Sequence, residues 1–362
     1  MNSTKSSNKS SQSHVFVLGL EEFIDKVICG DSAEILKQLP PESVDTIVTS
    51  PPYYGQRDYG APVNSYDKII GNEPTPEEYV NNLMAVFSEC VRVTKKSGSI
   101  FFNVGDKYGN GSLLLVPYLF VREAVKRTKV NLINQITWIK PNPQPRQFKR
   151  RLVSSTEPIF HFVKGEEYQY YPKAFMEGQA ITRNNKKAHD KIGMKYFGLI
   201  EKSDLTNQQK QLAKKELEDV IQEVKEGKIW SFRMKIRGIH SAAYGGYEGG
   251  RKEHIRVKGF TIIRMYDRPM KRDVIETPIL SLKYLKHPAI YPETLVQELL
   301  NLTTLPHSVV LDPFLGSGTT AVVAKRMGRH FIGIDINKKY CDAAIKRIKE
   351  TVVEPALREF IL

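Results

Sequence analysis

The chain alternates short apolar runs with amphipathic stretches, and this alternation restricts the fold more than any other feature of the sequence. Runs such as "VDTIVTS" (44–50) and "SVVLDPF" (308–314) predict buried strands. The segment 76–93 predicts a helix, because a capping box with proline at the first helical position, 75–78, precedes its apolar stripe. Strands that alternate with helices are typical of a mostly parallel sheet covered on both faces. The sequence therefore predicts an α/β fold with a doubly wound sheet.

Composition along the chain indicates four parts. Residues 1–14 are rich in Ser, Asn and Lys and lack the apolar core of a signal peptide, which predicts a disordered arm. Regular alternation runs from about 26 to 164 and resumes at 287, within the predicted parts 15–164 and 261–362. In 165–260 the apolar runs are short and Lys and Arg are dense, which predicts an inserted basic lobe outside the sheet. We expect its polar helix, 206–225, to be a solvated amphipathic strut.

The charge balance narrows the class of partner. Lys and Arg number 54 against 40 Asp and Glu, a net charge of +14, which favours a polyanion or an acidic membrane surface, with simple solubility as the alternative. No run of 18 apolar residues exists, so no membrane span is expected. The three cysteines, Cys29, Cys90 and Cys341, show no CxxC spacing. They indicate a reducing compartment and predict neither a metal site nor a disulfide framework.

The segment "VVLDPFLGSGTT" (309–320) is typical of a cofactor turn. A strand ends at Asp312, the turn carries Gly316 and Gly318, and the next strand ends at Asp335. A phosphate-binding P-loop would need a lysine after the second glycine, and a dinucleotide fingerprint has no acid ahead of the turn. An acid there suits a ligand with a positive group, such as the amino end of S-adenosylmethionine. The second acid then suits the ribose of that cofactor.

The segment "TSPPYY" (49–54) is the second candidate motif. Prolines fix φ and remove donors, so the chain after Ser50 is rigid and its carbonyls are free. The Ser50 hydroxyl and the Pro51 carbonyl can accept hydrogen bonds from one amino group, while Tyr53 offers a flat face for a planar ring. Methylation of an exocyclic base nitrogen requires such positioning, because its lone pair is delocalised into the ring. A proline turn with a surface tyrosine is the alternative.

Together the two segments resemble the β group of amino-methylating DNA methyltransferases, the TSPPY type, in which the catalytic motif precedes the cofactor motif. The resemblance covers about 26–164 and 285–350. Further blocks that carry it are "ICGDSAEILKQLPPESVDTIVTSPPY", "ITWIKPNPQPRQFKRRLVSSTEPIFHFVK" and "GIDINKKYCDAAIKRI". It implies a seven-stranded methyltransferase sheet with a circularly permuted motif order. Residues 15–164 are then the catalytic half, 165–260 the target-recognition region and 261–362 the cofactor-binding half.

The resemblance also implies which residues form the site. The target base is held by Ser50, Pro51, Pro52 and Tyr53. S-adenosyl-L-methionine is bound by Asp31, His287, Pro288, Asp312, Phe314, Gly316, Ser317, Gly318, Thr319, Asp335 and Ile336. The charge of "PRQFKRR" further predicts DNA contacts by Arg146, Lys149, Arg150 and Arg151. Asp31 is explained equally well as a helix cap, and His287 with Pro288 as a helix start. Family members often have His where Thr156 stands, so that position carries no role over.

The activity that the resemblance implies is sequence-specific methylation of double-stranded DNA by base flipping and direct transfer. Its expected setting is the cytoplasm of a bacterium or archaeon, with a restriction endonuclease as functional partner. The family uses Ser-Pro-Pro mostly on cytosine N4 and Asp-Pro-Pro mostly on adenine N6, so cytosine N4 is expected and adenine N6 is the alternative. Carbon-5 methylation needs a Pro-Cys nucleophile, which this chain lacks. Rival classes are a non-catalytic DNA-binding protein on this scaffold and a nicotinamide dehydrogenase.

In an open parallel sheet, ligands bind beyond the carboxyl ends of the strands at the point where the strand order reverses. Thr49 and Asp312 end two predicted strands that are far apart in the sequence. We therefore expect these two strand ends to be neighbours in space, with the Pro-Pro corner and the glycine turn facing a common cavity.

Overall fold

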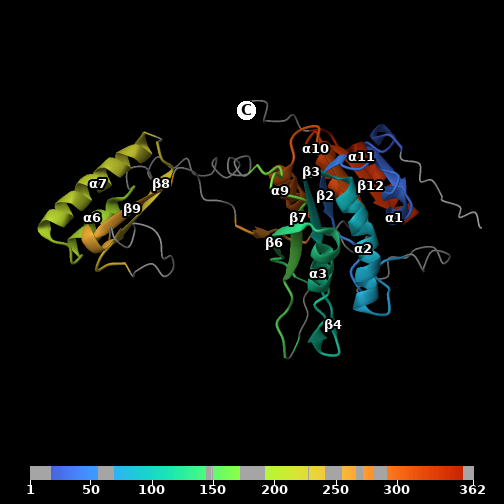
Figure 1. Ribbon diagram of the computed structural model, residues 1–362, viewed down its shortest axis with the longest axis horizontal. Coiled ribbons are helices and arrows are strands. Elements are labelled where there is room, and N and C mark those ends of the chain that lie inside the picture. Colours follow the sequence, from blue (N-terminus) through green and yellow to red (C-terminus); the bar gives the residue numbers. More distant parts are fainter. Residues whose placement is uncertain are drawn as a thin grey trace, which may run out of the picture. The chain divides into compact units, whose positions relative to one another are not determined.

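The protein forms two compact units in a computed structural model, Met1–Ala174 with Arg272–Leu362, and Phe175–Lys271 (Figure 1). Four predicted site residues, Arg146, Lys149, His287 and Pro288, lie outside the described residues, as does the predicted arm 1–14. The structure describes residues 18–55, 69–143, 148, 150–171, 192–226, 228–240, 255–265, 272–279 and 292–353.

The first unit is built on one sheet of eight strands in the order β1-β12-β11-β2-β3-β7-β6-β10. Neighbouring strands are parallel except at β7, which is antiparallel to both β3 and β6. The strands are β1 (Lys26–Cys29), β2 (Val44–Thr49), β3 (Thr94–Asn103), β6 (Asn131–Ile139), β7 (Thr156–Val163), β10 (Val274–Glu276), β11 (Val309–Asp312) and β12 (His330–Asp335). The predicted mostly parallel α/β sheet is confirmed, with one strand more than the seven expected. The extra edge strand, β10, has three residues, too few to leave a periodic pattern in the sequence.

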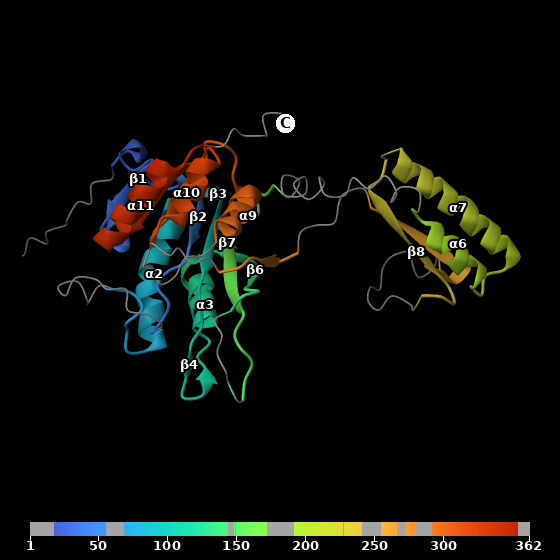
Figure 2. The ribbon, with the colours of Figure 1, turned by 180° about the vertical axis from the view of Figure 1, so that it is seen from behind.

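Helices cover both faces of this sheet, because successive strand residues point to opposite sides. Ile47 packs into the core cluster with α1, α2 and α3, whereas its neighbour Val48 packs into the cluster with α9, α10 and α11. Figure 2 shows the second set side by side in orange and red. A short hairpin of β4 (Tyr108–Gly109) and β5 (Ser112–Leu113) precedes α3. The helices are α1 (Ser32–Leu36), α2 (Pro76–Val93), α3 (Val116–Thr128), α9 (Glu293–Thr303), α10 (Thr319–Arg326) and α11 (Lys338–Glu350).

The second unit has a core of its own. Helices α6 (Met194–Glu201) and α7 (Asn207–Lys225) pack on a two-stranded antiparallel sheet of β8 (Ser231–Ile236) and β9 (Phe260–Met265). Helix α7 buries Ala213, Leu217 and Val220 in this core. The helix is amphipathic as expected, but the expected solvated strut is wrong, because one face of the helix packs into the core of its unit.

The unit boundaries also differ from the predicted lobe, 165–260. The first unit extends to Ala174 because backbone hydrogen bonds from Gln169 to Ser97 (2.9 Å) and from Tyr171 to Leu302 (2.7 Å) tie this segment to it. The second unit, which ends at Lys271, continues beyond 260 because β9 pairs with β8 along its whole length. Among the described residues, no helix combines the length and the apolar character needed to cross a bilayer.

Candidate active site

The carboxyl ends of β2 and β11 lie side by side in the centre of the sheet. The two strands pair in parallel, with Ile47 opposite Leu311. At their ends the Thr49 hydroxyl donates to Asp312 Oδ1 at 2.6 Å. The Thr320 hydroxyl of α10 lies 3.2 Å from the Val48 carbonyl. The expected adjacency of the two strand ends is confirmed, and the common cavity of the Pro-Pro corner and the glycine turn stays a prediction.

Asp312 joins three elements at this point. Its side chain is 1% exposed, and a buried charge must be compensated by hydrogen bonds. Its Oδ1 accepts from the Thr49 hydroxyl and from the Phe314 amide (3.0 Å), and its Oδ2 accepts from the Thr320 hydroxyl (2.7 Å). The carboxylate thereby connects β2, β11 and α10. Its expected contact with the positive end of the cofactor stays a prediction.

The Ser-Pro-Pro-Tyr corner follows β2 directly and is held from two sides. The Pro52 carbonyl accepts from the Tyr79 hydroxyl of α2 at 2.9 Å. Tyr53 is only 9% exposed, and its ring lies so close to Gly105 that a Cβ there would be 2.4 Å from two ring carbons. The half-buried Ser50 donates its hydroxyl hydrogen to the Tyr53 oxygen at 3.2 Å. This leaves the lone pairs of the Ser50 oxygen as acceptors.

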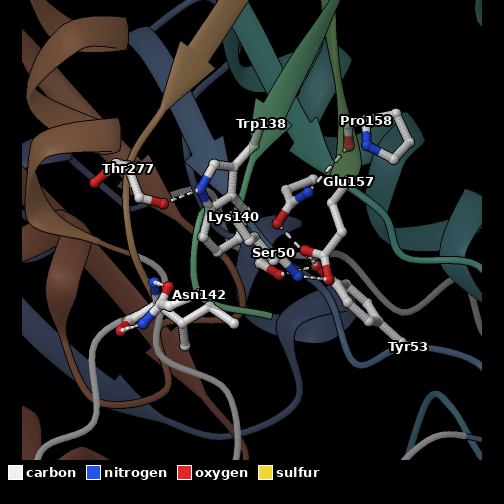
Figure 3. A network of polar contacts seen from close by, with 10 residues as sticks. Ser50, Tyr53, Trp138, Lys140, Asn142, Glu157, Pro158 and Thr277 are labelled. Carbon is white, nitrogen blue, oxygen red and sulfur yellow. Dashed lines mark hydrogen bonds and ion pairs between the residues drawn. The ribbon is translucent and has the colours of Figure 1, made fainter. Parts of the chain in front are cut away.

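The Tyr53 hydroxyl belongs to a network that sequence reasoning missed (Figure 3). It lies 2.8 Å from Asn103 Oδ1, at the end of β3, and 3.0 Å from Glu157 Oε2, near the start of β7. The Asn103 amide nitrogen donates to the Pro158 carbonyl at 3.0 Å, so its oxygen faces Tyr53. Two acceptors, one of them a carboxylate, therefore surround one phenolic hydroxyl.

Glu157 is in turn paired with Lys140, which follows β6. The two side chains form an ion pair and are 19% and 14% exposed, respectively. The Lys140 ammonium also lies 4.5 Å from the centroid of the Trp138 ring, a cation–π contact. Trp138 lies opposite Glu157 in the register of β6 and β7. The available signal was the alternation of "TWIK", which places Trp138 and Lys140 on one face of the strand.

The glycine turn after β11 has the geometry of a close backbone approach. Gly316 and Gly318 have positive φ angles of 52° and 86°, a region that favours glycine. A Cβ at Gly318 would lie 2.8 Å from Ala344 Cβ of α11. Ser317 and Thr319, both predicted cofactor residues, are each 3% exposed beside these glycines.

Arg347 of α11 supports this turn and was not predicted from the sequence. One of its guanidinium nitrogens donates to the Ser317 carbonyl at 2.6 Å, and the other donates to Glu293 at 2.9 Å. Because Glu293 begins α9, the arginine connects the turn to two helices on the same face of the sheet.

Asp335, the acid that ends β12, faces the same turn. Its Oδ2 accepts from the Gly316 amide and its Oδ1 from the Asn337 amide, both at 2.8 Å. Burial raises the pKa of Asp335 to about 6; the two amide donors oppose the rise and the charge of Asp312 adds to it. At neutral pH this carboxylate is ionised and fixed by backbone donors, an arrangement that fits the hydroxyls of a ribose.

The remaining predicted cofactor residues lie around this edge. Asp31 is the N-cap of α1 and accepts from the amides of Ala33 (2.8 Å) and Glu34 (3.4 Å). Its contact with adenine stays a prediction. Phe314 is half-buried against the core, and Ile336 is half-buried immediately after β12.

Two of the four predicted DNA-binding residues are described. Arg150 is exposed, and Arg151 is half-buried. The guanidinium carbon of Arg151 lies 3.7 Å from the ring centroids of both Tyr108 and Phe148. Such stacking restricts the guanidinium plane before any ligand binds.

Comparisons with known proteins agree with this geometry. A family profile described as DNA methylase matches residues 44–346, most of the chain. The chain belongs to the N6/N4 family of DNA methylases. The methylases of this family use S-adenosyl-L-methionine, so that cofactor is assigned to the chain, and the glycine turn with Asp335 fits it.

Individual relatives support the assignment. The Type II methyltransferase M.Cfr9I of Citrobacter freundii is 24% identical over 349 residues, covering 88% of this chain and 86% of its own. The Type II methyltransferase M.BglII of Bacillus subtilis is 27% identical over 326 residues, covering 90% and 69%. The solved structure of the PvuII cytosine-N4-specific DNA methyltransferase superimposes with a TM-score of 0.56 and 16% identity, covering 93% of this chain and 87% of that one. At this identity the superposition shows a shared methyltransferase fold.

Proposed function

We propose that this DNA methyltransferase transfers a methyl group from S-adenosyl-L-methionine to the N4 amino group of a cytosine flipped out of duplex DNA. The observation that carries the proposal is the junction of β2 with β11. The 2.6 Å hydrogen bond between Thr49 and Asp312 fixes the Ser-Pro-Pro-Tyr corner beside the glycine turn. A base held by one segment then lies next to a methyl donor held by the other.

The residues divide the work of the reaction between them. Tyr53 supplies a ring face for the flipped base, and stacking of this kind contributes about 1–3 kcal/mol per base. Ser50 and the Pro51 carbonyl accept the two amino hydrogens, which draws the nitrogen lone pair out of the plane of the base. The cofactor supplies a methyl group activated by a positive sulfur. Asp335 and the glycine turn hold the ribose and methionyl parts, so that orientation provides most of the acceleration.

The choice of cytosine N4 rests on Ser50, because members of the resembled family with Ser-Pro-Pro act mostly on cytosine. The test is to express the protein in cells without other DNA methylation and to digest their DNA to nucleosides. Mass spectrometry of the digest is expected to show N4-methylcytosine. Detection of N6-methyladenine in its place would leave the chemistry intact and move the target to adenine. Long-read sequencing of the same DNA would give the recognition sequence.

The expected contacts with DNA rest on positive charge. Base extrusion costs a few kcal/mol, and phosphate contacts must supply much of the remaining affinity. Arg150 is exposed and Arg151 is preoriented by two rings, so both are suited to grip the backbone next to the active site. The unit Phe175–Lys271 is the proposed target-recognition region. The Type II designation of the relatives supports a restriction endonuclease as the functional partner.

A further inference from the structure

A chain of hydrogen-bonded polar atoms leads from Ser50 through Tyr53 to Glu157. Ser50 donates to the Tyr53 hydroxyl at 3.2 Å, and this hydroxyl lies between Asn103 Oδ1 at 2.8 Å and Glu157 Oε2 at 3.0 Å (Figure 3). A tyrosine hydroxyl has a single hydrogen, so its two acceptors share it. Of the two, only Glu157 carries a charge. The chain of hydrogen bonds therefore connects the neutral serine to a carboxylate through one phenol.

We propose that Glu157 acts through Tyr53 to make Ser50 a stronger acceptor for the target amine and to take up the proton which that amine loses. This inference rests on the proposed function and assigns Glu157 as a positioning residue of the same site. Hydrogen bonds in a chain polarise one another, and a bond to a charged acceptor is about twice as strong as a neutral one. The charge of Glu157 thus reaches Ser50, and the serine gains part of the character of a carboxylate.

The proton balance of the reaction needs an acceptor for one amine proton, and the hydrogen-bonded residues Ser50, Tyr53 and Glu157 can supply one. As the amine nitrogen forms a bond to the methyl carbon, the carbon–sulfur bond breaks and its electron pair stays on sulfur. The nitrogen must then give up one proton to return to neutrality. Ser50 accepts this proton while its own passes to Tyr53, and the Tyr53 proton passes to Glu157. The serine and the tyrosine end as they began, and Glu157 releases the proton to solvent.

Lys140 stabilises the negative charge of Glu157 in this network. A carboxylate that is 19% exposed is costly to keep charged unless it is paired, and the ammonium of Lys140 provides the pair. The Trp138 ring, 4.5 Å from that ammonium, restricts the lysine in turn. The same ion pair offers an alternative, purely structural role for Glu157, because it joins the two ends of the loop between β6 and β7. The experiment must separate that role from the proposed one.

The test compares Tyr53→Phe, Glu157→Gln and the double variant in single-turnover methyl transfer to unmodified genomic DNA with labelled cofactor. Each single variant is expected to lower the rate about 100-fold, the lower end of the roughly 10²- to 10⁴-fold range of one general acid–base contribution. The dissociation constant for the cofactor and the KM for DNA are expected to stay within about threefold of wild type. Because both changes cut one chain, the double variant should be no more than about threefold slower than the slower single variant. Multiplying effects would overturn the proposal.

Glu89→Gln is the matched control. Glu89 forms an ion pair with Arg92 at 2.7 Å and is 22% exposed, close to the value for Glu157, but it lies on α2 away from the network. The rate of methyl transfer by Glu89→Gln should equal that of the wild-type protein. If Glu157→Gln does not fold, Tyr53→Phe still decides, because it keeps the ring and removes only the hydroxyl. A wild-type rate in Tyr53→Phe would refute the chain, whereas a wild-type protein that methylates no DNA would refute the proposed function.

Discussion

Replacing Asp312 by alanine should weaken the fold and separate the two halves of the active site. The carboxylate is 1% exposed and accepts from Thr49, Phe314 and Thr320 at 2.6, 3.0 and 2.7 Å. A hydrogen bond to a charged group contributes about 1.5–3 kcal/mol, so three give roughly 4.5–9 kcal/mol before correction. Because the buried charge itself is also removed, we expect the free energy of unfolding to fall by about 3–5 kcal/mol. That is a large part of the roughly 5–15 kcal/mol that stabilises a typical domain.

Urea unfolding followed by circular dichroism measures this loss of stability. The variant Asp312→Asn separates the effect of the carboxylate from the effect of removing the whole side chain. The amide oxygen keeps an acceptor for Thr49 and Phe314, but the variant loses the charge and the acceptor for the Thr320 hydroxyl, so the free energy of unfolding should fall by about 1.5–3 kcal/mol. Asp342→Ala is the control, because Asp342 is 57% exposed in a surface pair and its removal should have no measurable effect. If the free energy of unfolding of Asp312→Ala lies within about 1 kcal/mol of the wild-type value, the three hydrogen bonds do not hold the strand ends together.

Three further predictions concern the site. Gly105→Ala should slow methyl transfer about 100-fold while cofactor affinity stays normal, because its Cβ would lie 2.4 Å from the Tyr53 ring and displace it; equal loss of both would contradict this. Tyr53→Ala should likewise abolish transfer and spare cofactor binding, whereas Asp335→Ala should weaken cofactor binding first, as titration calorimetry can show. The cofactor should bind the ionised form of Asp335, whose pKa is raised to about 6, so affinity should fall as the pH drops below 6 and level off above 7. Asp335→Asn should abolish that pH dependence, and a flat profile in wild type would refute the role of the carboxylate.

The sequence was sufficient wherever local chemistry alone determines an element. The capping residues before Pro76 predicted α2 at 76–93, and the proposed strand ends at Thr49 and Asp312 are where β2 and β11 end. The adjacency of these two ends followed from a general property of parallel sheets. Such predictions need no knowledge of the exact register between strands.

The network around Tyr53 could not be predicted, because it depends on contacts across the sheet. Glu157 reaches Tyr53 only because β7 runs antiparallel to β3, and Lys140 meets Glu157 only in the observed register of β6 and β7. Neither residue belongs to a short motif. Arg347 was missed for the same reason, since its partners Ser317 and Glu293 come from elements far from it in the sequence.

The antiparallel course of β7 has a consequence for how such a protein can diversify. Lys140 and Glu157 lie at the two ends of the connection between β6 and β7, which carries Arg150 and Arg151. Their ion pair joins these two ends. If Arg150 and Arg151 contact DNA as proposed, changes in the length or charge of that connection would alter this contact and leave the hydrogen bond between Tyr53 and Glu157 in place. The ion pair of Lys140 and Glu157 would then allow the preference for a DNA sequence to change during evolution without a change in the proposed catalytic residues.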